Sequence, residues 1–254
     1  MLRSIWQNFQ LKEWKIKKDR KGLTLYCFSP PVMIATFLIE MILAFYVLIQ
    51  SIKYKSNVAI VITLVFLALF QLSEYQICEG SNPIFWTRIG LFVITFLPVL
   101  GIYLISKLDK DSKLLKIGFL IAIIIGTLFL LSPNSIKGAT CGGNYIMFDV
   151  DSSLYSFFGY YYFIFLFLGI WKSIQGIKAN HNKTKIKNAL KWFVIGYLSF
   201  ILPLTIVYIL IPITRVAVAS IMCGFAVIFA FILTFKIAPI YHECVKVDKK
   251  NKIQ

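Results

Sequence analysis

The chain has 254 residues, of which 59% are apolar and 15% are charged, and its formal net charge is +16. Soluble domains are about 45–50% apolar and about 25% charged, so this composition excludes an ordinary water-soluble globule. The positive charge does not indicate a nucleic-acid-binding protein, because no basic RNA-binding motif or aromatic stacking platform accompanies it. We therefore expect an integral membrane protein whose main partner is the lipid bilayer.

Residues 1–25 form a basic leader in which Trp6, Phe9 and Trp14 are interleaved with lysines. That pattern fits an interfacial helix, and a disordered basic tail fits it equally. The leader lacks the apolar run and small-residue cleavage site of a signal peptide. Its basic residues are Arg3, Lys12, Lys15, Lys17, Lys18, Arg20 and Lys21.

Residues 26–238 contain seven apolar stretches of the length that a hydrocarbon core about 30 Å thick requires of a spanning helix. The connections between them are too short to fold independently, so the sequence predicts one all-α membrane bundle, followed by a basic tail over residues 239–254. The predicted spans are Pro31–Gln50, Val58–Tyr75, Ile84–Ser106, Leu114–Leu131, Leu154–Gln175, Leu190–Ile211 and Val216–Ile237.

Lysine and arginine separate the two ends of this bundle. The first, third and fifth connections and the C-terminal tail, with the residues beside them, carry seventeen basic residues, whereas the even connections carry Lys137 and Arg215. The positive-inside rule then predicts a cytoplasmic C-terminus and an N-terminus outside the cell. The basic leader opposes this orientation, and a span count wrong by one is the alternative.

The first two spans carry polar stripes. Ser29, Met33, Thr36 and Glu40 recur at steps of four, three and four, so they share one helical face, with Glu40 near mid-bilayer. A carboxyl group in hydrocarbon is expected to be protonated or to hydrogen-bond another helix. Glu40 is therefore read as part of a ligand or proton pathway, or as a packed interhelical polar group.

By the same spacing, Thr63, Gln71, Glu74 and Cys78 share a face of the second span. Short connections make consecutive helices antiparallel neighbours, so the two stripes are expected to meet inside the bundle. Arg88, early in the third span, is a candidate ion-pair partner for Glu74, or it reaches toward the lipid headgroups.

The fifth span opens with Tyr155, Tyr160, Tyr161 and Tyr162, which predict an interfacial aromatic belt or, less simply, the lining of a pocket. The connection before it, from Ser132 to Ser153, is long for a compact bundle. It is read either as a lid over the outer mouth or as a solvated loop.

Three of the five cysteines, Cys27, Cys78 and Cys141, fall on the predicted outer side. Any two of them can form a disulfide in an oxidising compartment, or all three remain reduced, and the sequence does not choose a pair. With only two histidines, both on the predicted cytoplasmic side, no metal site or cofactor is expected.

The segments Cys27-Phe-Ser-Pro30, Phe70-Gln-Leu-Ser-Glu74 and Leu97-Pro-Val-Leu100 resemble an uncharacterised family of small bacterial multi-pass membrane proteins, which open with Cys-Phe-Ser and carry Gln-x-x-Glu late in the second helix. The resemblance covers roughly the first 105 residues. This chain departs from the pattern in its leader and in having Phe70 where a histidine often precedes the glutamine. The resemblance implies a bacterial inner membrane and supports an N-terminus outside, but it implies no activity.

The sequence is compatible with three functions. The first is a receptor-like or sensing bundle whose outward polar pocket, framed by Cys27, Ser29, Gln71, Glu74 and Arg88, binds a small ligand and signals through a cytoplasmic protein partner. The second is a transporter or channel for a small solute or proton that uses Glu40. The third, an intramembrane enzyme that uses Glu74 with Cys78 or Cys27, is ranked last because no histidine or metal site supports it.

Overall fold

A computed structural model describes residues 30–54, 58–80, 82–109, 113–141, 146–180, 183–210 and 217–243. The basic leader, Cys27, Ser29 and most of the C-terminal tail lie outside these residues. Seven described helices are long and apolar enough to cross a membrane, which confirms the predicted all-α, multi-pass bundle. They are α2 (Pro30–Tyr54), α3 (Val58–Glu79), α4 (Pro83–Asp109), α5 (Lys113–Leu131), α6 (Ser152–Ala179), α7 (Thr184–Leu210) and α8 (Val218–Ile232), which a π-helical segment, η3 (Leu233–Ile237), prolongs.

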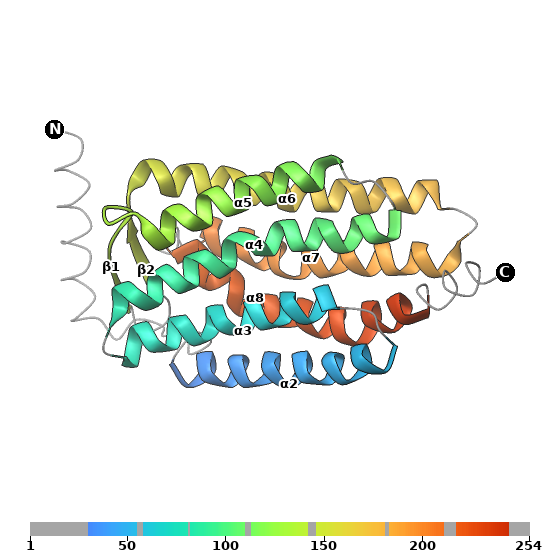
Figure 1. The fold of residues 1–254 in the computed structure, drawn as a ribbon, viewed down its shortest axis with the longest axis horizontal. Helices are drawn as coiled ribbons and strands as arrows, with labels where there is room; N and C mark the ends of the chain where they lie inside the picture. The colour runs from blue at the N-terminus through green and yellow to red at the C-terminus, as the bar shows by residue number, and fades with distance from the viewer. Residues whose placement is uncertain are drawn as a thin grey trace.

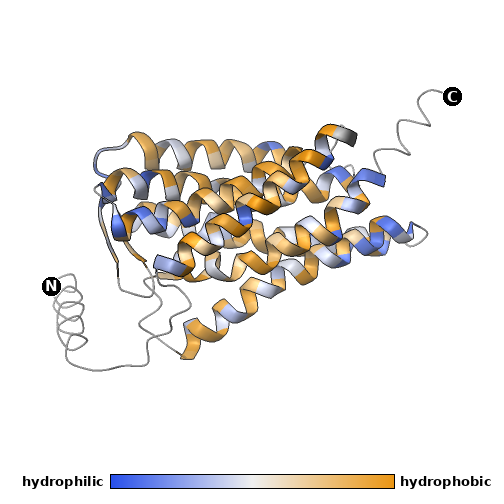
Figure 2. Ribbon diagram, turned by 90° about the horizontal axis from the view of Figure 1, so that it is seen from below, coloured by the Kyte–Doolittle hydropathy of each residue, from blue (hydrophilic) through white to orange (hydrophobic). Residues whose placement is uncertain are grey.

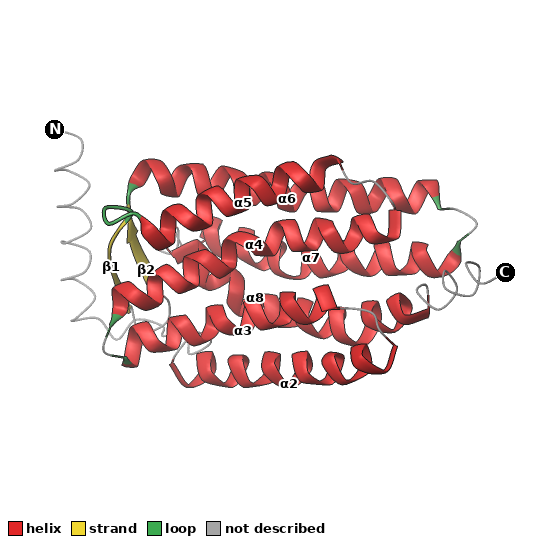
Figure 3. Ribbon diagram, in the orientation of Figure 1, coloured by secondary structure: helices red, strands yellow, loops and turns green. Residues whose placement is uncertain are grey.

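The helices lie side by side along the long axis of the molecule, and successive helices run in opposite directions (Figure 1). Helices α3, α5 and α7 therefore finish at one end of the bundle, and α2, α4 and α6 finish at the other. A small sheet also lies at the first end, which we call the hairpin end (Figure 3). Residues coloured as hydrophobic dominate the middle of the helices, and hydrophilic residues gather toward their ends (Figure 2).

Helix α4 is the centre of the bundle. It contacts α3, α5, α6 and α7, and 72% of the residues in its apolar spanning segment are buried. By contrast, α2 and α5 lie at the periphery, with 28% buried in each case. Their remaining apolar side chains are exposed on the outside of the bundle, where a spanning helix meets lipid.

The connection before α6 is a β-hairpin, not the plain solvated loop that the sequence also allowed. Strands β1 (Ile136–Cys141) and β2 (Ile146–Val150) pair antiparallel, with Cys141 opposite Ile146. Ile146 is fully buried and packs with Met33 of α2 and Ile77 of α3. The hairpin therefore covers the hairpin end of the α2–α3 pair.

The fifth predicted span begins two residues earlier than expected, at Ser152, because Asp151 caps it. The Asp151 carboxylate accepts hydrogen bonds from the backbone N–H groups of Ser153, at 3.0 Å, and Leu154, at 3.3 Å. Such a cap satisfies backbone donors that have no partner inside the helix. An Asp-Ser-Ser sequence before an apolar run is a recognisable signal for a helix start.

Candidate functional site

The buried face of α2 contains a single acidic residue, Glu40, which is 0% exposed. It lies near the middle of the span Pro30–Ile52 and shares its face with Met33, Ala44 and Val47. Neither carboxyl oxygen of Glu40 has a hydrogen-bond partner within the described part of the chain. An unpartnered carboxyl group in a membrane interior is costly and therefore points to a function.

Helix α3 presents Gln71 and Glu74 toward the same interior. They are 2% and 1% exposed, and both Gln71 Nε2 and Glu74 Oε1 lack a partner among the described residues. Thr63, from the same predicted stripe, instead donates to the Ala59 carbonyl at 2.8 Å. Threonine hydroxyls commonly donate to a carbonyl of their own helix in this way, whereas a carboxylate only accepts and needs a donor from elsewhere.

Thr36 of α2 behaves like Thr63. Its hydroxyl donates to the Met33 carbonyl at 2.9 Å, and its side chain is half-buried. Thr36 therefore lies on the predicted stripe without adding an unpartnered group to it. The groups left for binding are the carboxyls of Glu40 and Glu74 and the amide of Gln71.

The two stripes come together as expected, and α8 completes the cluster. Helices α2 and α3 pack against each other, and both contact α8. The carboxyl groups of Glu40 and Glu74 interact electrostatically with each other and with the buried thiol of Cys223 on α8. We call Glu40, Gln71 and Glu74, together with Ser220 and Cys223 of α8, the carboxyl cluster.

Two carboxylates cannot both stay charged at such a place without cost. Water does not screen them, because the five side chains of the carboxyl cluster are at most 2% exposed. In a medium of low dielectric constant, like charges repel strongly, and each charge also loses its hydration. A bound positive charge, either a proton or a small cation, removes this repulsion.

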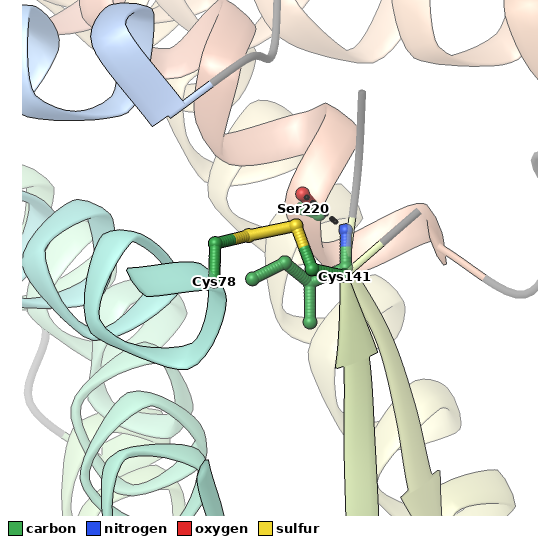
Figure 4. The surroundings of a disulfide bond; sticks show 4 residues. Cys78, Cys141 and Ser220 are labelled. Carbon is green, nitrogen blue, oxygen red and sulfur yellow. Dashed lines mark hydrogen bonds between the residues drawn. A yellow bond between two sulfur atoms is a disulfide. The ribbon is translucent and has the colours of Figure 1, made fainter. Parts of the chain in front are cut away.

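Ser220 joins the carboxyl cluster to the hairpin. Its side chain hydrogen-bonds the carboxyl group of Glu74, and its Oγ accepts a hydrogen bond from the backbone N–H of Ile146 at 3.3 Å. Figure 4 shows this contact beside the disulfide bond between Cys78 and Cys141. Two successive hydrogen bonds through Ser220 therefore connect the buried carboxyl group of Glu74 to the hairpin.

The disulfide bond links α3, which carries Glu74, to the same hairpin a second time. Cys78 follows Glu74 by one helical turn on α3, and Cys141 pairs across the hairpin with Ile146. The structure thus forms one of the three cysteine pairs that the sequence left open. It also means that Cys78 is not a free thiol here, so the thiol-dependent enzyme loses one of its two nucleophiles.

The suggested ion pair between Arg88 and Glu74 is wrong. The Arg88 guanidinium donates to the backbone carbonyls of Phe129, Leu130 and Ser132, at 3.2, 2.6 and 3.0 Å. The last carbonyls of a helix have no partner inside it, and Arg88 satisfies those of α5. Neither Arg88 nor Glu74 lines either of the two cavities described below.

The tyrosines at the start of α6 do not act as one belt. Tyr160 is 72% exposed, as an interfacial residue is, but Tyr161 and Tyr162 are each 5% exposed. The Tyr161 hydroxyl donates to the Thr95 carbonyl at 2.9 Å, which ties α6 to α4. Tyr162 interacts electrostatically with Cys223 and so lies beside the carboxyl cluster.

A cavity of about 30 Å³ lies next to the cluster. It is about the size of one water molecule. Its walls include Thr63, Tyr162, Tyr197 and Cys223. Cys223 therefore represents the carboxyl cluster in this wall, and neither Glu40 nor Glu74 lines the cavity.

Sequence reasoning missed the contribution of α8. Ser220 and Cys223 stand three residues apart in the segment Ala-Ser-Ile-Met-Cys-Gly. Its small residues, Ala, Ser and Gly, are typical of closely packed membrane helices. The spacing of Ser220 and Cys223 puts them on one face, and that signal was available. What the sequence did not contain was the position of α8 beside α2 and α3.

The fold and the site define an integral membrane protein with seven apolar helices and a buried pair of carboxyl groups. A scan against models of known protein families finds no match, and a search of curated proteins finds none either. The resemblance to the small bacterial family therefore stays a proposal.

Proposed function

We propose that this protein is a receptor-like sensing bundle of the bacterial inner membrane that responds to a positive charge, a proton or an alkali-metal ion, bound at Glu40 and Glu74. The observation that carries the proposal is the pair of fully buried carboxyl groups, of whose four oxygens three have no partner among the described residues. Oxygen atoms of this kind are the ligands that hard cations prefer.

The path through Ser220 supports sensing. A positive charge bound at Glu74 alters the carboxyl group to which the Ser220 hydroxyl is hydrogen-bonded. Ser220 also accepts a hydrogen bond from Ile146 of the hairpin. The hairpin is cross-linked to α3 and packs on Met33 of α2. Occupancy of the carboxyl cluster is thereby coupled to the position of a structure at the bundle end.

We propose that the hairpin end faces outside and the lysine-rich end faces the cytoplasm. The distribution of lysine and arginine supports this orientation, and so does the disulfide, because disulfides persist in oxidising compartments. The test is labelling of intact cells with a membrane-impermeant maleimide, using Lys137→Cys at the hairpin end and Lys183→Cys at the other. We expect label on Lys137→Cys alone, in a background lacking Cys27, Cys223 and Cys244; label on Lys183→Cys alone reverses the orientation.

The cation site is tested by thermal unfolding of the full chain in nanodiscs, in choline chloride and then with lithium, sodium or potassium. A separate series lowers the pH in choline chloride, which distinguishes a proton from a metal ion. A ligand that binds only the folded state adds about 2.7 kcal/mol of stability when its free concentration is 100 times its Kd. We expect the bound cation or proton to raise the Tm of the wild-type chain, and Glu40→Gln and Glu74→Gln to lose this increase.

The matched control is Glu79→Gln, which removes a carboxyl group from the same helix at an exposed position. It is expected to respond like the wild-type chain. If the wild-type chain, Glu40→Gln and Glu79→Gln all respond alike to every cation and to pH, the proposed site does not exist.

Transport is the second candidate function, and the mid-span position of Glu40 favours it. Liposomes containing the wild-type chain or Glu40→Gln distinguish it from sensing. Cation or proton flux that Glu40→Gln abolishes would replace sensing by transport. Binding without flux supports the sensing bundle.

A further inference from the structure

A second and larger cavity lies in the hairpin-end half of the bundle, and neither Glu40 nor Glu74 lines it. Its volume is about 210 Å³, and α4, α6, α7 and α8 all contribute to its walls. An engineered apolar cavity of about 150 Å³ binds benzene, so this space is large enough for a substituted aromatic ring. Along α6 it extends from Tyr155 to Phe163, which is about 12 Å at the helical rise.

The walls of this cavity are rich in aromatic rings. Tyr155, Phe158, Tyr162, Phe163 and Tyr208 surround it, and their edges and faces suit an aromatic guest in offset or edge-to-face contact. Tyr155 and Tyr162 also bring phenolic hydroxyl groups to the cavity wall, and such a group can donate or accept a hydrogen bond. A guest with a single polar substituent can therefore gain a hydrogen bond while its ring stays in apolar surroundings.

The position of the cavity indicates how a guest reaches it. The wall includes the buried residues Ile94 and Met222, which are 0% and 3% exposed, and also Tyr208, which is 43% exposed. Tyr208 belongs to the spanning part of α7, whose exposed surface meets lipid. The guest is thus a molecule that partitions into the bilayer first.

Gly159 of α6 leaves part of this space open. It lines the cavity, and a Cβ atom built on it meets no other atom within 4 Å. The absence of a side chain at this helical position contributes to the volume, and it lowers the helix propensity relative to alanine.

We propose that this cavity is a binding site for a compact, membrane-permeant aromatic molecule with one hydroxyl-type substituent. Tyr162 and Met222 form its wall toward the smaller cavity, so the guest lies one side chain away from Cys223. The site does not depend on the proposed cation site, because no residue of the carboxyl cluster lines it.

The test uses p-cresol as the probe and toluene as its counterpart without the hydroxyl group. Binding is measured by thermal unfolding and by titration of the full chain in nanodiscs. We expect p-cresol to stabilise the wild-type chain. Gly159→Leu, whose Cβ has room and whose side chain occupies part of the cavity, is expected to weaken binding at least tenfold. Tyr162→Phe is expected to weaken p-cresol by about three- to tenfold, the worth of one neutral hydrogen bond, without affecting toluene.

Two controls separate this result from other effects. Ser156→Leu adds the same side chain to an exposed position of the same helix and is expected to bind p-cresol like the wild-type chain. Glu40→Gln is also expected to retain p-cresol binding, so failure of the cation site and failure of this site are distinguishable. Equal binding by the wild-type chain and Gly159→Leu overturns the proposal, and so does a co-purified lipid chain, seen by native mass spectrometry, that p-cresol does not displace.

Discussion

The backbone N–H of Ile146 donates to the side-chain oxygen of Ser220 across a sequence separation of 74 residues. This contact joins the hairpin to α8 at the level where Ser220 also meets Glu74. Because both partners are fully buried, water cannot replace either of them if the contact is lost.

Ser220→Ala is therefore expected to destabilise the protein by about 1–3 kcal/mol, since it leaves the Ile146 N–H and one side of Glu74 without a partner. The amide of Ile146 should also lose protection against hydrogen exchange. Ser199→Ala serves as the control, because the Ser199 hydroxyl donates only to the Gly196 carbonyl of its own helix. Its effect should stay within about 0.5 kcal/mol. Equal losses in the two variants contradict a special role for Ser220.

Loss of the disulfide is the second prediction. Cys78 and Cys141 are 63 residues apart, and removing a native disulfide typically costs about 2–5 kcal/mol. The bilayer already restricts the unfolded chain, so we expect the lower half of that range for Cys78→Ser with Cys141→Ser. Dithiothreitol should lower the Tm of the wild-type chain and leave that of the double variant unchanged. A double variant that still responds to the reductant would contradict this pairing.

A third prediction concerns Tyr197 of α7, whose hydroxyl lies between Gly101 of α4 and Gly169 of α6. A methyl group at residue 101 would collide with that hydroxyl, so Gly101→Ala is expected to cost about 1–3 kcal/mol. The Tyr197 hydroxyl has no partner among the described residues, so Tyr197→Phe alone should cost little.

Because the two changes meet at one point, Tyr197→Phe should recover much of the stability lost in Gly101→Ala, with a coupling energy of about 0.5–3 kcal/mol. Chemical unfolding of the two single variants and the double variant measures it. Gly138→Ala provides the control, since a Cβ there meets nothing within 4 Å. Simple additivity of the two changes would show that Tyr197 does not fill the space beside Gly101.

The fourth prediction is that Arg88 and Glu74 contribute to stability independently of each other. Arg88→Lys should destabilise the end of α5, because a single ammonium group cannot reproduce the planar fork that reaches three carbonyls. We expect a loss of about 1–3 kcal/mol, as for a charged hydrogen bond. Glu74→Gln combined with Arg88→Lys should be additive within about 0.5 kcal/mol. A large coupling energy would restore the ion pair that the sequence suggested.

Hydropathy alone determined the seven helices, because each span needs about 20 apolar residues and the polar interruptions are short. Helical spacing also put Glu40 on one face of α2, and Gln71 and Glu74 on one face of α3. Antiparallel neighbours joined by a short connection then bring such faces together, and the structure has them so.

Only the tertiary structure decided what those faces meet. Nothing in the order of residues indicates that α8 packs against α2 and α3, because long-range neighbours depend on how all the helices fill the bundle at once. The same packing turned Arg88 toward α5, selected Cys141 as the partner of Cys78, and left Gly159 beside open space. The sequence determined which residues are polar in an apolar span, and the packing of the bundle determined which of them are left without a partner.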